Sequence, residues 1–220
     1  MPSGPAQPVP VLPLTDAVLF PHAVLPLRVT HFRQRTLVRD ALLAQRTVAL
    51  ALSRSGMEPG EDSHFDVFPL ACLARIQAVE WLPDDCYDLK LLGLARIRLE
   101  RRVREYPYAK ARVHVMPHEP YTEDDPLVQI ERQASIRVLE RLRGAAAAAA
   151  GVALPPLPGT DKSYEAVVSM MCMCLDAGAE EKLSLLELDS VIERGKQVRE
   201  RIERRLRAAT RPEPGEPRAN

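Results

Sequence analysis

The 220-residue chain has few aromatic side chains, few cysteines and no excess of either charge. Its 30 basic and 30 acidic residues cancel, which argues against a protein devoted to nucleic acids or membrane surfaces without excluding local patches. The longest apolar runs, such as 166–175, are far shorter than the roughly 18 residues of a membrane span. Four scattered cysteines do not make a disulfide framework, so we expect a reduced, cytoplasmic protein with no membrane partner.

Sequence patterns typical of enzymes are also missing. The five histidines show no paired spacing of the kind that holds a metal. The segment 159–163 (GTDKS) differs from a phosphate-binding loop because Asp161 stands where that motif needs glycine, and it indicates a loop leading into a helix N-cap. No nucleophile elbow or dinucleotide fingerprint is present. We therefore expect no enzyme activity, no catalytic residue, no cofactor and no metal site.

The first 120 residues predict a β-rich body. Hydrophobic residues make up 46% of the chain, enough for a substantial core. Apolar residues alternate with charged ones, or form short apolar runs, as in strands. These stretches are 47–52, 70–78, 87–92, 95–103 and 109–115, with a turn at 83–85. One helix is expected over 31–45. The pattern favours a curled sheet or partly closed barrel over 9–120, after a flexible N-terminus at 1–8.

Residues 121–209 predict helices, which makes the chain α+β. Over 127–143 one apolar stripe is expected, formed by Leu127, Ile130, Ala134, Val138, Leu139 and Leu142. The alanines at 145–150 either extend this helix or begin a mobile Ala/Pro-rich break over 145–160. Further helices are expected over 164–175 and 184–208, the second opened by Ser184 and Glu187 at capping-box spacing. We expect the tail at 210–220 to be disordered.

Two stripes of basic residues occur, at 96–112 and at 194–211. Stripes of this density bind phosphates in some proteins, so an RNA-binding module is the alternative to the function given below. Aromatic residues that would stack on bases are scarce beside them, with only Tyr106 and Tyr108 nearby. A solvated charged surface is therefore favoured over an RNA contact, and RNA is the less expected partner.

Five segments in a fixed order resemble the Lon protease N-terminal (substrate-binding) domain. They are VLPLTDAVLFPHAVLPLRV at 11–29, LARI at 73–76, GLAR at 93–96, PYAKARV at 107–113, and LSLLELD at 183–189 followed by Glu193 and Arg194. The resemblance covers about residues 9–207. It implies a PUA-like β-barrel followed by a helical bundle, in agreement with the patterns above.

In full-length Lon proteases this domain helps to recognise unfolded or tagged polypeptides, and ATPase and serine-lysine protease modules follow it. Neither module is present in these 220 residues. The resemblance therefore implies a non-catalytic polypeptide-binding module that acts as an adaptor or chaperone-like factor. Its expected partners are unfolded or tagged polypeptides, or a protein partner such as a separate protease.

The expected contact is the segment after the first Pro-Leu repeat, where prolines at 21 and 26 remove backbone donors and keep the chain extended. The candidate polypeptide-binding residues are Phe20, Pro21, His22, Ala23 and Val24. The other interpretation is that Phe20 and Val24 fill the barrel. His22 and Ala23 stand where the family usually has glycine and methionine. An arginine face at 33, 35 and 39 is a second candidate contact.

Overall fold

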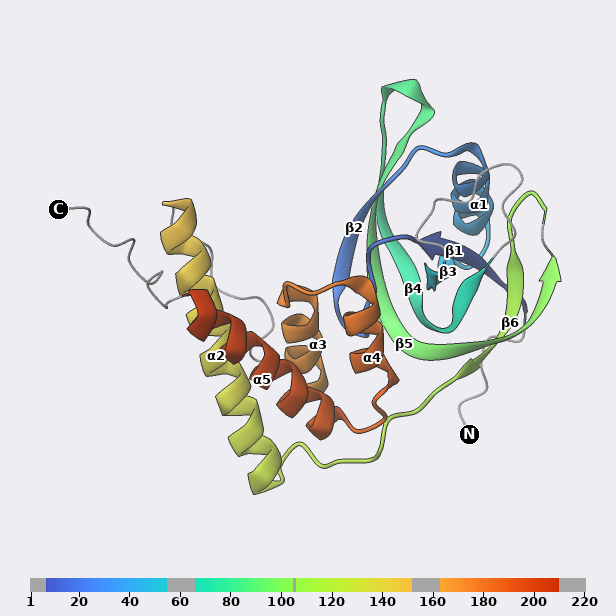
Figure 1. The fold of residues 1–220 in the computed structure, drawn as a ribbon. Helices are drawn as coiled ribbons and strands as arrows, with labels where there is room; N and C mark the ends of the chain where they lie inside the picture. The colour runs from blue at the N-terminus through green and yellow to red at the C-terminus, as the bar shows by residue number, and fades with distance from the viewer. Residues whose placement is uncertain (1–6, 55–65, 105, 152–162, 210–220) are drawn as a thin grey trace.

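The computed structural model describes residues 7–54, 66–104, 106–151 and 163–209. They form a β-barrel followed by a group of helices that lies against one side of it (Figure 1). The α+β class and the order of the two parts are confirmed. The expected division at 120/121 falls in the extended segment between the last strand and the second helix. Most of the predicted flexible N-terminus at 1–8, the predicted tail at 210–220 and most of the predicted break at 145–160 lie outside the described residues.

Six strands form one mixed sheet in the order β2-β5-β4-β3-β1-β6. The strands are β1 (Val9–Leu14), β2 (Val24–Val29), β3 (Thr47–Ser53), β4 (Val67–Trp81), β5 (Tyr87–Arg104) and β6 (Lys110–Val115). β1 and β3 are parallel and the other pairs are antiparallel. β6 pairs with both β1 and β5, which closes a ring of five strands and leaves β2 outside it, where β5 is its only partner among the described strands.

β5 is one long strand rather than the two short ones expected at 87–92 and 95–103. Its first half pairs with β2 and its second half with β6, while β4 pairs with it from Tyr87 to Arg98. The short 3-10 helix Pro83–Asp85 makes the expected turn between β4 and β5. The two apolar patterns are separated in the sequence by Gly93, which is a ladder residue opposite Ala74 and not a break.

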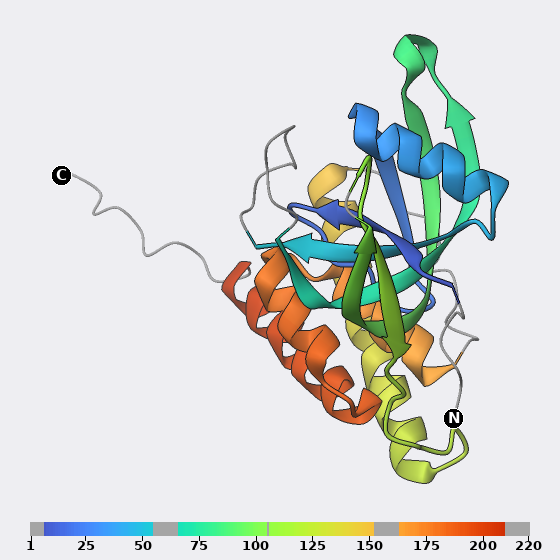
Figure 2. The ribbon, with the colours of Figure 1, turned by 90° about the vertical axis from the view of Figure 1, so that its right-hand side faces the viewer.

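Both faces of the sheet are buried because small and large apolar residues alternate along the strands. One face carries mainly valines and alanines, including Val11, Ala49 and Ala71. The other carries larger side chains that pack on α1 (Phe32–Leu43) through Leu37, Val38 and Ala41. In Figure 2 this helix crosses one end of the barrel.

The helical part contains α2 (Pro126–Ala150), α3 (Tyr164–Cys174), α4 (Ala179–Glu187) and α5 (Val191–Ala209). The alanine run continues α2, which ends at Gly151 in a left-handed conformation. The stripe expected on α2 is wrong at its start: Leu127 and Ile130 are 71% and 59% exposed. The buried face is one residue away and includes Val128, Ser135, Val138 and Leu139, because this face packs on α3 and α5.

The predicted helix over 184–208 is also wrong. α4 ends at Glu187, and α5 begins at Val191 with Ser190 accepting a hydrogen bond from the Glu193 amide at 3.4 Å. Ser184 lies within α4. The pair at the start of the helix is thus Ser190 and Glu193, which has the same spacing as the predicted pair, Ser184 and Glu187.

None of the helices within the described ranges is both long enough and apolar enough to span a membrane.

Candidate functional site

The structure divides the predicted segment 20–24 between a buried end and an exposed end. Phe20 is fully buried among residues of both parts, including Leu70 of the barrel and Val167 of α3. Pro21 is also buried and Ala23 half-buried. His22 is exposed, and Val24 is 47% exposed. Phe20 therefore fills the junction between barrel and helices, and only His22 and Val24 present side chains to a partner.

Gly93 and His22 fix the path of this segment. The His22 amide donates to the Gly93 carbonyl at 2.8 Å, and the Gly93 amide donates to the Ala23 carbonyl at 2.9 Å. A Cβ on residue 93 would lie 2.1 Å from the Phe20 carbonyl oxygen, so only glycine permits this approach. His22 has a φ of 63°, the left-handed region that glycine adopts most easily, which explains why glycine is usual here in the resembling family.

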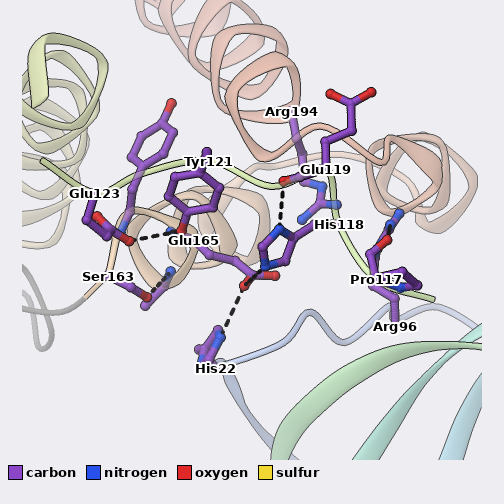
Figure 3. Close-up of polar contacts among 12 residues, drawn as sticks. His22, Arg96, Pro117, His118, Glu119, Tyr121, Glu123, Ser163, Glu165 and Arg194 are labelled. Carbon is purple, nitrogen blue, oxygen red and sulfur yellow. Dashed lines mark hydrogen bonds and ion pairs between the residues drawn. The ribbon is translucent and has the colours of Figure 1, made fainter. Parts of the chain in front are cut away.

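The His22 side chain belongs to an ion-pair cluster at the junction (Figure 3). Its Nε2 lies 3.4 Å from Oε2 of Glu165 on α3, and His118 Nε2 lies 3.7 Å from the same oxygen. Burial raises the pKa of Glu165, but the hydrogen bond and charges from His22, His118 and Arg194 outweigh it and hold that pKa below its ordinary value. Within the described ranges, no group of three or more His, Cys, Asp or Glu side chains is arranged to hold a metal ion.

Side chains of the same region cap the N-terminus of α3. Ser163 is the N-cap and accepts from the Ala166 amide. The Glu123 carboxylate accepts from the Tyr164 amide at 2.9 and 3.1 Å and from the Tyr121 hydroxyl at 2.9 Å. These contacts satisfy amides that a helix start leaves without partners, and they tie the segment after β6 to α3 (Figure 3). Burial and the neighbouring Glu123 raise the pKa of Tyr121 above its ordinary value.

Two buried arginines hold the link between α4 and α5. Arg96 of β5 is 2% exposed and donates to the carbonyls of Leu186 at 2.8 Å, Leu188 at 2.9 Å and Pro117 at 3.0 Å, and to Asp189 at 2.7 Å. Arg194 of α5 is fully buried and donates to the carbonyls of Leu185 and Leu188. Free carbonyls at the end of α4 are thereby satisfied, which explains why the helix ends there. Burial and the nearby Arg96 lower the pKa of Arg194.

Part of the basic charge of the two stripes, mostly in the stripe at 194–211, is used within the molecule. Arg96 and Arg194 are buried. On α5, Arg199 pairs with Glu131 at 2.7 Å, Arg205 with Glu181 at 3.1 Å, and Arg207 with Glu203 at 3.0 Å. The second candidate contact, on α1, includes Arg35, which pairs with Asp85. Nothing in these contacts favours RNA binding.

The strand that follows the exposed end of the segment borders a surface groove. Val24 begins β2, and Pro26 and Arg28 of this strand are also exposed. The groove has a volume of about 600 Å³ and lies over β2 and the adjoining ends of β4 and β5. Its lining combines apolar Pro26 and Val79 with the Arg28–Asp88 ion pair, in which the two nitrogen–oxygen distances are 2.7 and 2.8 Å.

Sequence reasoning found the segment but not its partners. Glu165 lies 143 positions from His22, and no local pattern connects them. Gly93 and Arg96 were within a segment that carried the family resemblance, and that was the only signal pointing to them. The groove over β2 depends on which strand ends the sheet, and residue alternation does not specify strand order.

Comparison with known proteins identifies the family. The model of the ATP-dependent protease La (LON) substrate-binding domain matches residues 8–204. The chain belongs to this family. It is 36% identical over 107 residues to Lon protease 2 of Myxococcus xanthus, which is 49% of this chain and 13% of that protein. It is 25% identical over 190 residues to the Lon protease of Cytophaga hutchinsonii, which is 84% of this chain and 23% of the relative. The matches thus span less than a quarter of these relatives.

Solved structures show the same fold. A Lon N-terminal domain protein from Xanthomonas campestris matches with a TM-score of 0.61 and 23% identity, over 87% of this chain and 96% of that one. The N-terminal domain of the Mycobacterium avium complex Lon protease matches with a TM-score of 0.64 and 18% identity, over 90% and 98%. The resemblance inferred from the sequence is therefore confirmed for the family and the fold.

Proposed function

We propose that this chain recognises polypeptide segments, and that the contact lies at the exposed end of segment 20–24 and along the neighbouring groove. The observation that carries the proposal is the position of Val24, an apolar residue that is 47% exposed and lies two positions before Pro26, which lines an apolar and charged groove. Exposed apolar side chains beside a groove are typical of peptide-binding surfaces. The family, a substrate-binding domain, supports the same role.

Within this proposal the five predicted residues have different tasks. Val24 contacts the polypeptide, and His22 borders it. Phe20, Pro21 and Ala23 hold the segment in place, since Phe20 is in the junction core and Ala23 bonds to Gly93. The role is recognition without catalysis, in the cytoplasm, as an adaptor or chaperone-like factor that presents polypeptides to a protein partner such as a separate protease.

The proposal is tested with a fluorescently labelled unfolded polypeptide, whose anisotropy is measured while the intact protein is added. Val24→Ser is compared with Val103→Ser, because Val103 is equally apolar, 53% exposed, and on the distant half of β5. We expect at least a fivefold weaker affinity for Val24→Ser and no change for Val103→Ser. Equal affinity of both variants and the wild type would place the contact elsewhere. Phe20→Ser is unsuitable, because loss of this buried ring would destabilise the junction.

A further inference from the structure

The proposed function leaves open how a polypeptide is held, and the backbone of β2 answers this. β2 is the first strand of the sheet order and pairs only with β5 among the described strands. Its other side therefore carries backbone groups without a strand partner. Such an edge is a template on which an extended chain pairs as an additional strand.

The hydrogen bonds beside Gly93 show which residues face this open edge. The Gly93 amide donates to the Ala23 carbonyl, so the carbonyl of residue 23 points toward β5, as the amide of residue 25 does in a regular strand. Residues of an antiparallel ladder alternate between the two sides of the strand. Leu25 and Leu27 therefore bond to β5 in turn, and the backbone groups of Val24, Pro26 and Arg28 point to the open edge.

The open edge offers a defined set of donors and acceptors. Val24 and Arg28 each supply an N–H and a carbonyl, while Pro26 supplies only a carbonyl because proline has no N–H. Proline is tolerated within a strand where its missing N–H faces away from the neighbouring strand, which agrees with this assignment. It also limits uncontrolled pairing between copies of the protein.

The side chains along the edge indicate the class of segment that fits. Val24 and Pro26 are exposed on one face of β2, and Leu25 and Leu27 are half-buried on the other. Arg28 already makes two hydrogen bonds to Asp88, so its charge does not call for an acidic partner. An uncharged, extended segment with apolar residues on both faces is complementary to this edge.

We propose that an extended apolar segment of an unfolded polypeptide binds by pairing with the open edge of β2, through the backbone groups of Val24, Pro26 and Arg28. This inference rests on the proposed function and adds its mode of recognition. Backbone pairing binds many sequences, because every residue except proline offers the same groups, and a module that recognises unfolded chains needs this tolerance.

The first test uses a labelled seven-residue apolar peptide and two versions of it, each N-methylated at one alternate set of residues. Only one edge of an extended peptide faces β2, so methylation of one set removes the pairing N–H groups and methylation of the other does not. We expect at least a tenfold loss of affinity for one version and less than a twofold loss for the other. Equal effects of the two methylations would overturn the pairing.

The second test changes the protein. Val24→Pro removes an edge donor without touching the ladder to β5, and we expect at least a fivefold loss of peptide affinity. Val24→Thr keeps the donor and is the matched control, with less than a twofold change expected. Pro26→Val adds a donor at the same edge, and we expect the affinity to rise several-fold. Unchanged affinity in both Val24→Pro and Pro26→Val would overturn the inference.

The two levels of the proposal fail differently. If the wild type binds no unfolded polypeptide, the proposed function fails and the pairing with it. If the wild type binds but ignores N-methylation, the proposed function stands and pairing by β2 is wrong. Far-UV circular dichroism and the urea midpoint show whether Val24→Pro is folded, and the methylated peptides decide the question with the wild-type protein alone.

Discussion

The junction between barrel and helices and the open edge of β2 lie at opposite ends of segment 20–24, and different interactions form them. At the junction, two buried charged groups have polar partners: Arg96 makes four hydrogen bonds and Glu165 lies beside two histidines. At the edge, apolar side chains are exposed and backbone groups have no partner among the described strands. The junction fixes the segment, and the edge is left for a partner.

This contrast teaches where substitutions will act. Removing either member of a buried charged contact lowers stability, because water cannot reach the group that is left and replace the contact. At an exposed edge water replaces the lost contact, so a substitution changes binding and leaves stability nearly constant. Changes at the junction should therefore lower stability, and changes at the edge should lower affinity.

The largest effect on stability is expected from Arg96→Met. This change removes hydrogen bonds from the buried carbonyl of Leu186 and the half-buried carbonyl of Leu188, and it should lower the free energy of unfolding by about 4 kcal/mol. Urea unfolding measures it. Arg98→Met, at an exposed arginine of the same strand, is the control and should change the value by less than about 0.5 kcal/mol. Equal costs would show that Arg96 does not secure the junction.

A somewhat smaller loss is expected from Gly93→Ala. The added Cβ would lie 2.1 Å from the Phe20 carbonyl, and the resulting displacement should cost about 3 kcal/mol. Gly144→Ala on α2 is the matched control, since no atom lies within 4 Å of its new Cβ and alanine favours a helix by about 0.8 kcal/mol. The two glycine substitutions should thus shift the urea midpoint in opposite directions, and a shift in the same direction would refute the close approach.

Glu165→Gln should lower stability by about 1 kcal/mol at neutral pH, because it removes the carboxylate that His22 and His118 face. The folded-state pKa of Glu165 is below its ordinary value, so its ionised form stabilises the fold above that value. This contribution is lost as the pH falls below the ordinary carboxyl value of about 4.3. Urea unfolding across this range should show the wild type and variant converging at acid pH; a constant difference would contradict the pKa shift.

A difference of similar size is expected between two substitutions of His22. Both His22→Gly and His22→Ala remove the contact with Glu165, but only glycine adopts a φ of 63° without strain. The glycine variant should be more stable than the alanine variant by about 1 kcal/mol. Thermal or urea unfolding at one pH gives this difference directly, and a more stable alanine variant would mean that the left-handed conformation is not retained.

Residue patterns predicted the elements better than their ends. Alternation predicted the halves of β5 because its side chains face two different surroundings, but it did not reveal that the strand continues through Gly93. On α2, faces one residue apart are both apolar, and packing on α3 and α5 selects Val128 over Leu127. The break after Glu187 depends on carbonyls that accept hydrogen bonds from Arg96 and Arg194. Arg96 lies 90 positions before the carbonyl of Leu186 in the sequence.

The candidate site shows the same limit. The sequence singled out segment 20–24 through its prolines and its family resemblance, and it left open whether Phe20 was a contact or part of the core. The structure assigns Phe20 to the core and Val24 to the surface. Sequence patterns do not reveal that β2 ends the sheet, because strand order follows from pairing between distant segments.

The most direct test of the account is residue-specific amide hydrogen exchange, measured by NMR on the wild-type protein with and without an unfolded polypeptide. The amides of Val24 and Arg28 should become at least tenfold better protected when the polypeptide is present, while that of Val103 should not change. Protection that appears elsewhere, with Val24 and Arg28 exchanging as before, would contradict binding at the open edge of β2.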